Sequence, residues 1–300
     1  MAVKMSYEIR PSKAITRLVF VDVLRRLATM ANMQDYQYVG FGAVEFIDFE
    51  LIHRQLRITD MISIEDDPDG IERYEWNRPF NNITVLAGRS STVLPTIDWS
   101  RLSVVWLDYT SALTKGVIAD CENLAQVLIP GSVLAVTINA HPARRIAGRR
   151  DALGKAIGRE RVPIGVTDNR LGGWGLAQAQ HSVLTACLQG VFAVKPDAAS
   201  WRQLLNITYQ DRAQMQMIAG IVGAPAVDRT LDQLRFEDLP EVRTGRNALH
   251  IRVPLLTSRE RAWAEQHLPL PAAGSALSLP GVDDRDLKAY SRVYRRMGAS

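Results

Sequence analysis

The sequence predicts an α/β protein built on a mostly parallel sheet that helices cover on both faces. Short apolar runs alternate with segments of helical length, and each run is apolar on both faces, as a fully buried strand requires. The runs are Tyr36–Phe41, Met61–Ile64, Ile83–Leu86, Val104–Leu107 and Val133–Ile138. The helical segments between them are Val44–Leu56, Gly70–Asn77, Ser90–Leu94 and Leu113–Leu128.

Further elements are predicted before and after this alternation. A helix over Pro11–Met33 comes first, with Ser12 as its cap. Leu204–Tyr209 and Met215–Val222 flank a polar loop, which predicts an antiparallel β-hairpin at one edge of the sheet. A basic, helical stretch (Ala143–Arg161) lies between the two regions. 

These boundaries divide the chain into three parts: an N-terminal helical segment (1–34), a sheet domain (35–225) and a C-terminal extension (226–300). In the extension, Leu249–Leu255 resembles a strand, and Thr257 with Glu260 forms the capping box of a helix. A linker rich in Pro, Ala, Gly and Ser (Pro269–Pro280) then leads to a final basic helix, Asp283–Met297.

The composition indicates an ordinary globular protein. Of the 300 residues, 47% are hydrophobic and 23% charged, and no apolar stretch is long enough to cross a membrane. The amino terminus lacks the features of a signal peptide. The two cysteines, Cys121 and Cys187, form no CxxC pair, so we expect a reducing cytoplasm. The net charge of +4 permits an anionic partner, and an oligomer stays possible.

The first predicted strand ends in a short glycine motif, Gly40-Phe41-Gly42. Glycines at this point let the backbone approach a ligand and turn into a helix whose N–H groups favour polar ligand groups. Glu65 ends the second strand, where a dinucleotide-binding fold has its ribose-binding acid, and Asp66 and Asp67 follow it. The alternative is an ordinary strand-to-helix turn with a solvated acidic loop that caps the next helix.

Asp108 ends the fourth predicted strand, after the apolar run Val104–Leu107. An acid at the carboxyl end of a central strand lies at the ligand crevice of an open α/β sheet. It could orient a substrate, act as a general base or bind a metal. Alternatively it caps the following helix, a role that Thr110 or Ser111 can also fill.

The order of these elements resembles that of class I S-adenosylmethionine (SAM) methyltransferases, whose sheet is Rossmann-like. More closely, the chain resembles a family of bacterial proteins described as "putative O-methyltransferases", over about Arg10 to Asn139 and more loosely over the hairpin. The runs that carry the resemblance are YVGFGAVEFIDFELIHRQL, ISIEDD, NRPF, VLAGRSSTVLP and VVWLDY. The resemblance implies an enzyme with SAM as its cofactor.

The resemblance also implies roles for particular residues. Gly40 and Gly42 match the first two glycines of the cofactor loop, Glu65 matches the ribose acid, and Asp108 falls at the motif ending strand four. Asp66 adjoins the ribose acid, and Arg89 and Ser90 fall where adenine is contacted. The chain departs from the family pattern at Tyr38, Val44 and Arg89, where an acid, a third glycine and an Asp are usual; Glu45 could instead offer a carboxylate to the methionine amino group.

Three functions follow as hypotheses. The first is methyl transfer from SAM to an oxygen nucleophile of an unknown acceptor, with Asp108 as base or orienting residue. The second is a methyltransferase-like binding module that senses a nucleotide or binds a protein or nucleic acid; the third is an NAD-type oxidoreductase, whose full glycine fingerprint is missing. A nucleic acid would contact the basic stretch through Arg144, Arg145, Arg149 and Arg150, although such runs are usually solvated faces.

Overall fold

The computed structural model describes residues 10–196, 198–271 and 275–297, which form one eight-stranded sheet covered by helices. The strand order is β3-β2-β1-β4-β5-β7-β6-β8, and β7 runs antiparallel to both of its neighbours while the remaining pairs are parallel. The strands are β1 (Gln37–Gly40), β2 (Asp60–Glu65), β3 (Ile83–Ala87), β4 (Ser103–Asp108), β5 (Val133–Asn139), β6 (Ser200–Gln210), β7 (Gln214–Gly223) and β8 (Leu249–Ile251). The predicted mostly parallel sheet with its hairpin is confirmed, and the short strand β8 lies beyond the hairpin.

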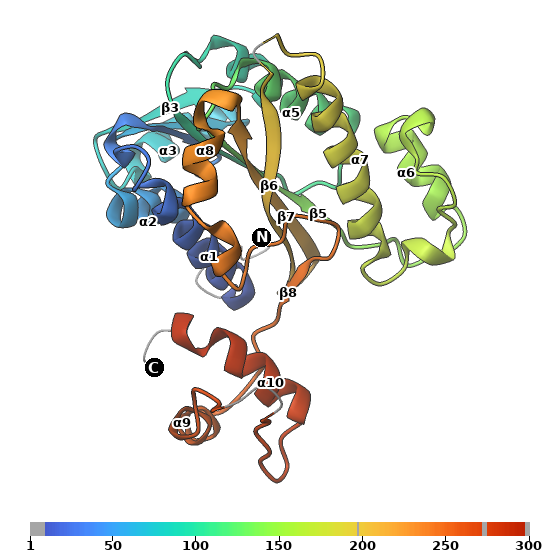
Figure 1. Cartoon of the computed structure of the whole chain (residues 1–300). Helices are drawn as coiled ribbons and strands as arrows, with labels where there is room; N and C mark the ends of the chain where they lie inside the picture. Colours follow the sequence, from blue (N-terminus) through green and yellow to red (C-terminus); the bar gives the residue numbers. More distant parts are fainter. Residues whose placement is uncertain (1–9, 197, 272–274, 298–300) are drawn as a thin grey trace.

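Helices cover both faces of the sheet, with α1, α2 and α8 on one side and α5 and α7 on the other (Figure 1). The helices are α1 (Pro11–Leu27), α2 (Ile47–Leu56), α3 (Ile71–Asn77), α4 (Ser90–Val93), α5 (Lys115–Val127), α6 (Arg149–Ile157), α7 (Gly175–Phe192), α8 (Pro225–Gln233), α9 (Ser258–Gln266) and α10 (Asp284–Val293). Successive strand residues point to opposite faces, so Val105 packs against α5 while Trp106 packs against α1. Two cores result, one on each face.

The last part of the chain forms a small lobe with its own apolar cluster, Ala264, Leu277, Leu287 and Tyr290. Figure 1 shows α9 and α10 standing beyond β8, apart from the sheet. The predicted capping box on α9 is present, with both the Thr257 and Glu260 side chains bonded. The three-part division of the chain stays a proposal; residues 1–9 of the first part and 272–274 of the predicted linker lie outside the described residues.

Two local predictions are wrong. Ser12 does not cap α1, because it lies inside the helix and Arg10 is the N-cap residue. Instead the carboxylate of Asp211, between β6 and β7, accepts the backbone N–H groups of Ser12 and Lys13 at 2.9 and 3.0 Å. The basic stretch is α-helical over Arg149–Ile157 and forms a 3₁₀ turn over Arg159–Arg161, which leaves Arg144 and Arg145 in the preceding loop. No helix in the described part of the chain is long and apolar enough to span a membrane.

Candidate functional site

The sheet brings the predicted site residues to one edge. β1 lies between β2 and β4 and is parallel to both, so that Gly40 is level with Ser63 and with Trp106. Because parallel strands end at the same edge, Glu65 and Asp108 lie on either side of the loop that follows Gly40.

Glu65 is fixed to the glycine loop by a short hydrogen-bonded chain. The Ser63 hydroxyl donates to Glu65 Oε1 at 2.6 Å and accepts the backbone N–H of Gly42 at 2.9 Å. Burial raises the pKa of Glu65, while hydrogen bonds from Ser63 and from the N–H groups of Gly42 and Ala43 oppose that rise. Its side chain is therefore a preorganised acceptor at the loop. The sequence analysis did not identify Ser63, whose one signal was that it is a polar residue inside an apolar run.

The loop itself has a backbone that few residues tolerate. Ala43 and Phe46 both have positive φ, at 50° and 47°, a conformation that costs a residue with a side chain about 1–3 kcal/mol. A Cβ on Gly42 would come within 2.6 Å of the Phe46 ring and of Ser63 Oγ. Gly42 is thus required by close packing, and the strained loop is typical of a ligand-binding segment.

The other predicted cofactor residues surround this loop. Glu45 is exposed on the same loop. Arg89 Nε lies 3.6 Å from Asp66 Oδ1 across the ends of β2 and β3, and both side chains are largely exposed. The Ser90 hydroxyl donates to the buried Asp120 carboxylate at 2.6 Å, which fixes the orientation of this side chain.

Asp108 pairs with a lysine from the first helix. Lys13 Nζ forms an ion pair with Asp108 Oδ2, and the two side chains are 6% and 11% exposed. Asp108 does not cap the next helix, because Thr114 is the N-cap residue of α5 and its side chain accepts the N–H of Val117; Thr110 and Ser111 do not cap it either. The capping alternative is therefore wrong, and sequence reasoning had not connected Lys13 with Asp108.

A second buried ion pair lies close to the first. Arg17, one helical turn after Lys13, pairs with Asp48 of α2, and both side chains are at most 9% exposed. Tyr209 of β6 lies near both pairs; burial and then the charge of Asp108 raise its pKa well above the ordinary value. Its phenol therefore stays protonated at neutral pH.

A cavity of about 170 Å³ opens beside the ion pair of Lys13 and Asp108. The residues that line it come from α1, from the ends of β4 and β5, and from the hairpin, and include Lys13, Asp108, Tyr109, Asn139, Tyr209 and Asp211. The cavity is next to the glycine loop in the fold, since Phe41 packs edge-to-face against Tyr109 with ring centroids 5.2 Å apart. The cofactor residues and the cavity therefore adjoin.

The basic stretch lies away from this edge. Arg149 donates to the carbonyl of Ala143, and Lys155 and Arg159 both pair with Asp151. Figure 1 places α6 outside α7, on the far side of the sheet from α1. Its arginines thus take no part in the arrangement around Asp108.

Comparison with known structures gives weak likenesses. A "putative O-methyltransferase" from Klebsiella pneumoniae is 14% identical, with 75% of this chain and 84% of that one covered and a TM-score of 0.39. Cofactor-bound Rv0187 from MTB is 13% identical, with 74% and 82% covered and a TM-score of 0.40. The "putative methyltransferase" complexed with Trm112 from Haloferax volcanii is 15% identical, with a TM-score of 0.32; the alignment spans 44% of this chain and just 57% of that one.

Comparison of the sequence itself is more informative. No curated protein matches the chain. One family model, described as "Putative O-methyltransferase", matches residues 5–298, nearly the whole chain. The resemblance noted in the sequence is thereby confirmed: the chain belongs to the family described as "Putative O-methyltransferase".

Proposed function

We propose that this protein transfers the methyl group of SAM to an oxygen nucleophile bound beside Asp108. The observation that supports it best is the joining of the glycine loop to Glu65 through Ser63, directly beside the cavity that Asp108 lines. Family membership supports an enzyme of this class over a binding module.

The residues around the glycine loop fit the cofactor. Glu65 has a fixed carboxylate that can accept the hydroxyl groups of a ribose, a strong type of hydrogen bond because the acceptor is charged. Gly40 and Gly42 leave room for the ligand to approach the backbone, and Glu45 offers a charge for the methionine ammonium. Asp66, Arg89 and Ser90 would flank the adenine. When bound, SAM supplies a methyl group activated by its sulfonium.

Asp108 and Lys13 have different roles toward the methyl acceptor. Asp108 accepts the hydrogen bond of the acceptor hydroxyl and takes its proton, and the neighbouring Lys13 ammonium stabilises the oxygen as negative charge develops. Orientation of that oxygen toward the cofactor supplies much of the acceleration, because methyl transfer needs little covalent help. The small cavity favours a small acceptor, or the end of a larger one.

The departure at Tyr38 does not weaken this assignment. Tyr38 is buried and packs against Phe49 with ring centroids 4.9 Å apart, so it occupies the core beneath the loop. The loss of an acid at this position therefore reflects packing between β1 and α2.

Calorimetric titration with SAM and S-adenosylhomocysteine tests the proposal. We expect one molecule to bind per chain, and a protein that binds neither would be a binding module of another kind. Titration with NAD distinguishes the oxidoreductase hypothesis.

Three further proposals concern the surroundings of the enzyme. We propose a cytoplasmic location, which two unpaired cysteines, Cys121 and Cys187, support. A nucleic-acid contact through Arg144, Arg145, Arg149 and Arg150 rests on their charge and on the exposure of Arg144, Arg145 and Arg150. We also propose that copies of the chain assemble into an oligomer.

A further inference from the structure

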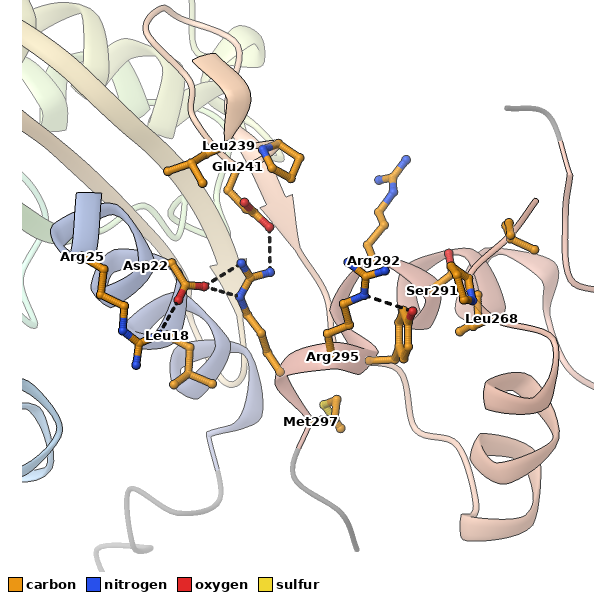
Figure 2. Close-up of a pocket in the computed structure, with 15 residues that line it drawn as sticks. Leu18, Asp22, Arg25, Leu239, Glu241, Leu268, Ser291, Arg292, Arg295 and Met297 are labelled. Atoms are coloured by element: carbon orange, nitrogen blue, oxygen red, sulfur yellow. Dashed lines mark hydrogen bonds and ion pairs between the residues drawn. The ribbon is translucent and has the colours of Figure 1, made fainter. Parts of the chain in front are cut away.

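A groove lined by cationic side chains separates the C-terminal lobe from α1 and β8. Its volume is about 610 Å³, and it continues past Arg292 and Arg296 into a second opening of about 830 Å³. Figure 2 shows this second opening, with Arg25, Arg292 and Arg295 among the residues around it. We call the first of these spaces the cationic groove; its basic residues are Arg243, Arg252, Arg285, Lys288, Arg292 and Arg296.

The helix α10 places its cations on the wall of the groove by its periodicity. Arg285, Lys288, Arg292 and Arg296 follow each other at three- and four-residue steps, so they share one face of the helix and its following turn. The opposite face holds Leu287 and Tyr290 in the core of the lobe. At 1.5 Å per residue the row is about 16 Å long.

Charge in this part of the chain is not balanced. Residues 240–300 contain ten Lys and Arg against six Asp and Glu, so they account for the whole net charge of +4. Arg243, Lys288 and Arg292 have no carboxylate partner within residues 10–196, 198–271 and 275–297. Arg243 bonds to carbonyl oxygens at 2.7 and 2.8 Å.

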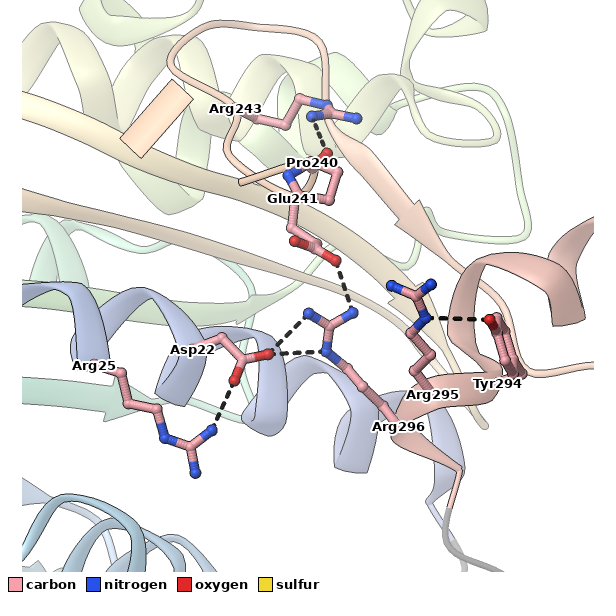
Figure 3. A network of polar contacts seen from close by, with 8 residues as sticks. All are labelled: Asp22, Arg25, Pro240, Glu241, Arg243, Tyr294, Arg295 and Arg296. Carbon is pink, nitrogen blue, oxygen red and sulfur yellow. Dashed lines mark hydrogen bonds and ion pairs between the residues drawn. The ribbon is translucent and has the colours of Figure 1, made fainter. Parts of the chain in front are cut away.

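The nearby acids already have partners. Figure 3 shows Arg296 held between Asp22 of α1 and Glu241, at 2.8 and 2.7 Å. This network links the lobe to α1 and occupies Glu241, the acid among the residues that line the cationic groove. Arg252 and Arg285 pair with Asp286 and Asp283. The cations without a carboxylate partner, Arg243, Lys288 and Arg292, are therefore available to a ligand.

We propose that the cationic groove binds the phosphate backbone of a single-stranded nucleic acid. Within the row, Arg285 pairs with Asp283 and Arg296 with Asp22 and Glu241. Lys288 and Arg292, together with Arg243 of the same groove, can then contact successive phosphates of an extended strand. The cations line a concave wall, which suits one strand better than the convex surface of a duplex. Phe, Tyr and Trp are absent from the described residues that line the groove, so binding rests on phosphate contacts, which carry no sequence information. This site is independent of methyl transfer.

The test uses a fluorescein-labelled oligouridylate, whose anisotropy is followed during titration with the full-length protein at several salt concentrations. The double variant Lys288→Gln/Arg292→Gln should bind more weakly, and the slope of log K against log salt should fall by about two. The matched control, Arg54→Gln/Arg101→Gln, removes the same charge from exposed positions outside both basic regions and should leave both quantities unchanged.

Several results would overturn the proposal: no binding by the wild type, an equal loss in both variants, or pyrophosphate competing as well as the strand at equal phosphate concentration. A DNA duplex that binds as tightly as the single strand would also overturn it. Because the four substituted side chains, Lys288, Arg292, Arg54 and Arg101, are exposed, both variants should keep the circular dichroism and the SAM affinity of the wild type. An unchanged SAM affinity separates this test from the test of the methyltransferase.

Discussion

Glu65 and Asp108 end the two strands that flank β1, yet their carboxylates have different partners. Glu65 accepts from neutral donors, a hydroxyl and backbone N–H groups. Asp108 is neutralised by the ammonium of Lys13 in a buried ion pair. The first arrangement keeps a negative charge ready for a ligand, and the second ties a reactive group to the fold. An acidic side chain at equivalent positions therefore serves binding on one side and reaction plus stability on the other.

The largest effect should come from Asp108→Asn. Loss of a general base lowers a rate about 10²- to 10⁴-fold, and we expect this loss without a change in SAM affinity. Tritiated SAM incubated with an extract of the source cells measures methyl incorporation without a known acceptor. Full activity of the Asn variant would make Asp108 a structural residue and remove the contrast with Glu65.

Replacement of Lys13 should lower the stability of the protein, because Asp108 depends on this partner. Lys13→Met leaves Asp108 buried and unpaired, which typically costs about 3–5 kcal/mol, so the urea midpoint should fall strongly. Adding Asp108→Asn should recover part of this loss, because no uncompensated charge then remains. Lys155→Met is the control: its exposed pair with Asp151 should matter little. Equal midpoints for Lys13→Met and the control would contradict a tight buried pair.

Glu65→Ala should act on binding. Loss of hydrogen bonds to a charged group weakens SAM binding by about 1.5–3 kcal/mol, or about 10- to 100-fold in Kd, as calorimetry would detect. Asp66→Ala, a neighbouring exposed acid, should change Kd far less. If Asp66 proved the more important residue, the ribose assignment would pass to it.

The smallest expected effect is on the pH dependence of the free energy of unfolding. Burial raises the pKa of Glu65 in the folded state, so the native protein binds more protons than the unfolded chain just above the ordinary Glu pKa. The contribution of Glu65 to the free energy of unfolding therefore decreases as pH rises through that window. Glu65→Gln should remove this slope, and urea melts between acidic and neutral pH would show it. A variant with an unchanged slope would mean that Glu65 is not desolvated as the structure indicates.

Most of the sheet could be predicted because its strands carry a local signal. Runs such as Val104–Leu107 are apolar at every position, and that pattern arises in few settings other than a strand buried on both faces. Glu65 and Asp108 followed from the same logic, since they end such strands. Local patterns thus placed the acids at the correct edge.

Their partners could not be predicted, because contacts between distant segments leave no local pattern. Lys13 and Asp108 are 95 residues apart, and Asp211 lies 199 residues from Ser12. The cap of α1 was missed for this reason: a local cap was expected at Ser12, and the hairpin supplies one instead. The helix α8 was also missed, although Pro225 at its first turn is a common start signal.

The cap that Asp211 provides has a kinetic consequence. The amides of Ser12 and Lys13 bond to the hairpin, so they can exchange with solvent only when α1 and the β6–β7 loop separate. Lys13 also closes one side of the cavity, so the same separation would widen the entrance for an acceptor. The exchange rate of these two amides therefore reports how often the cavity opens.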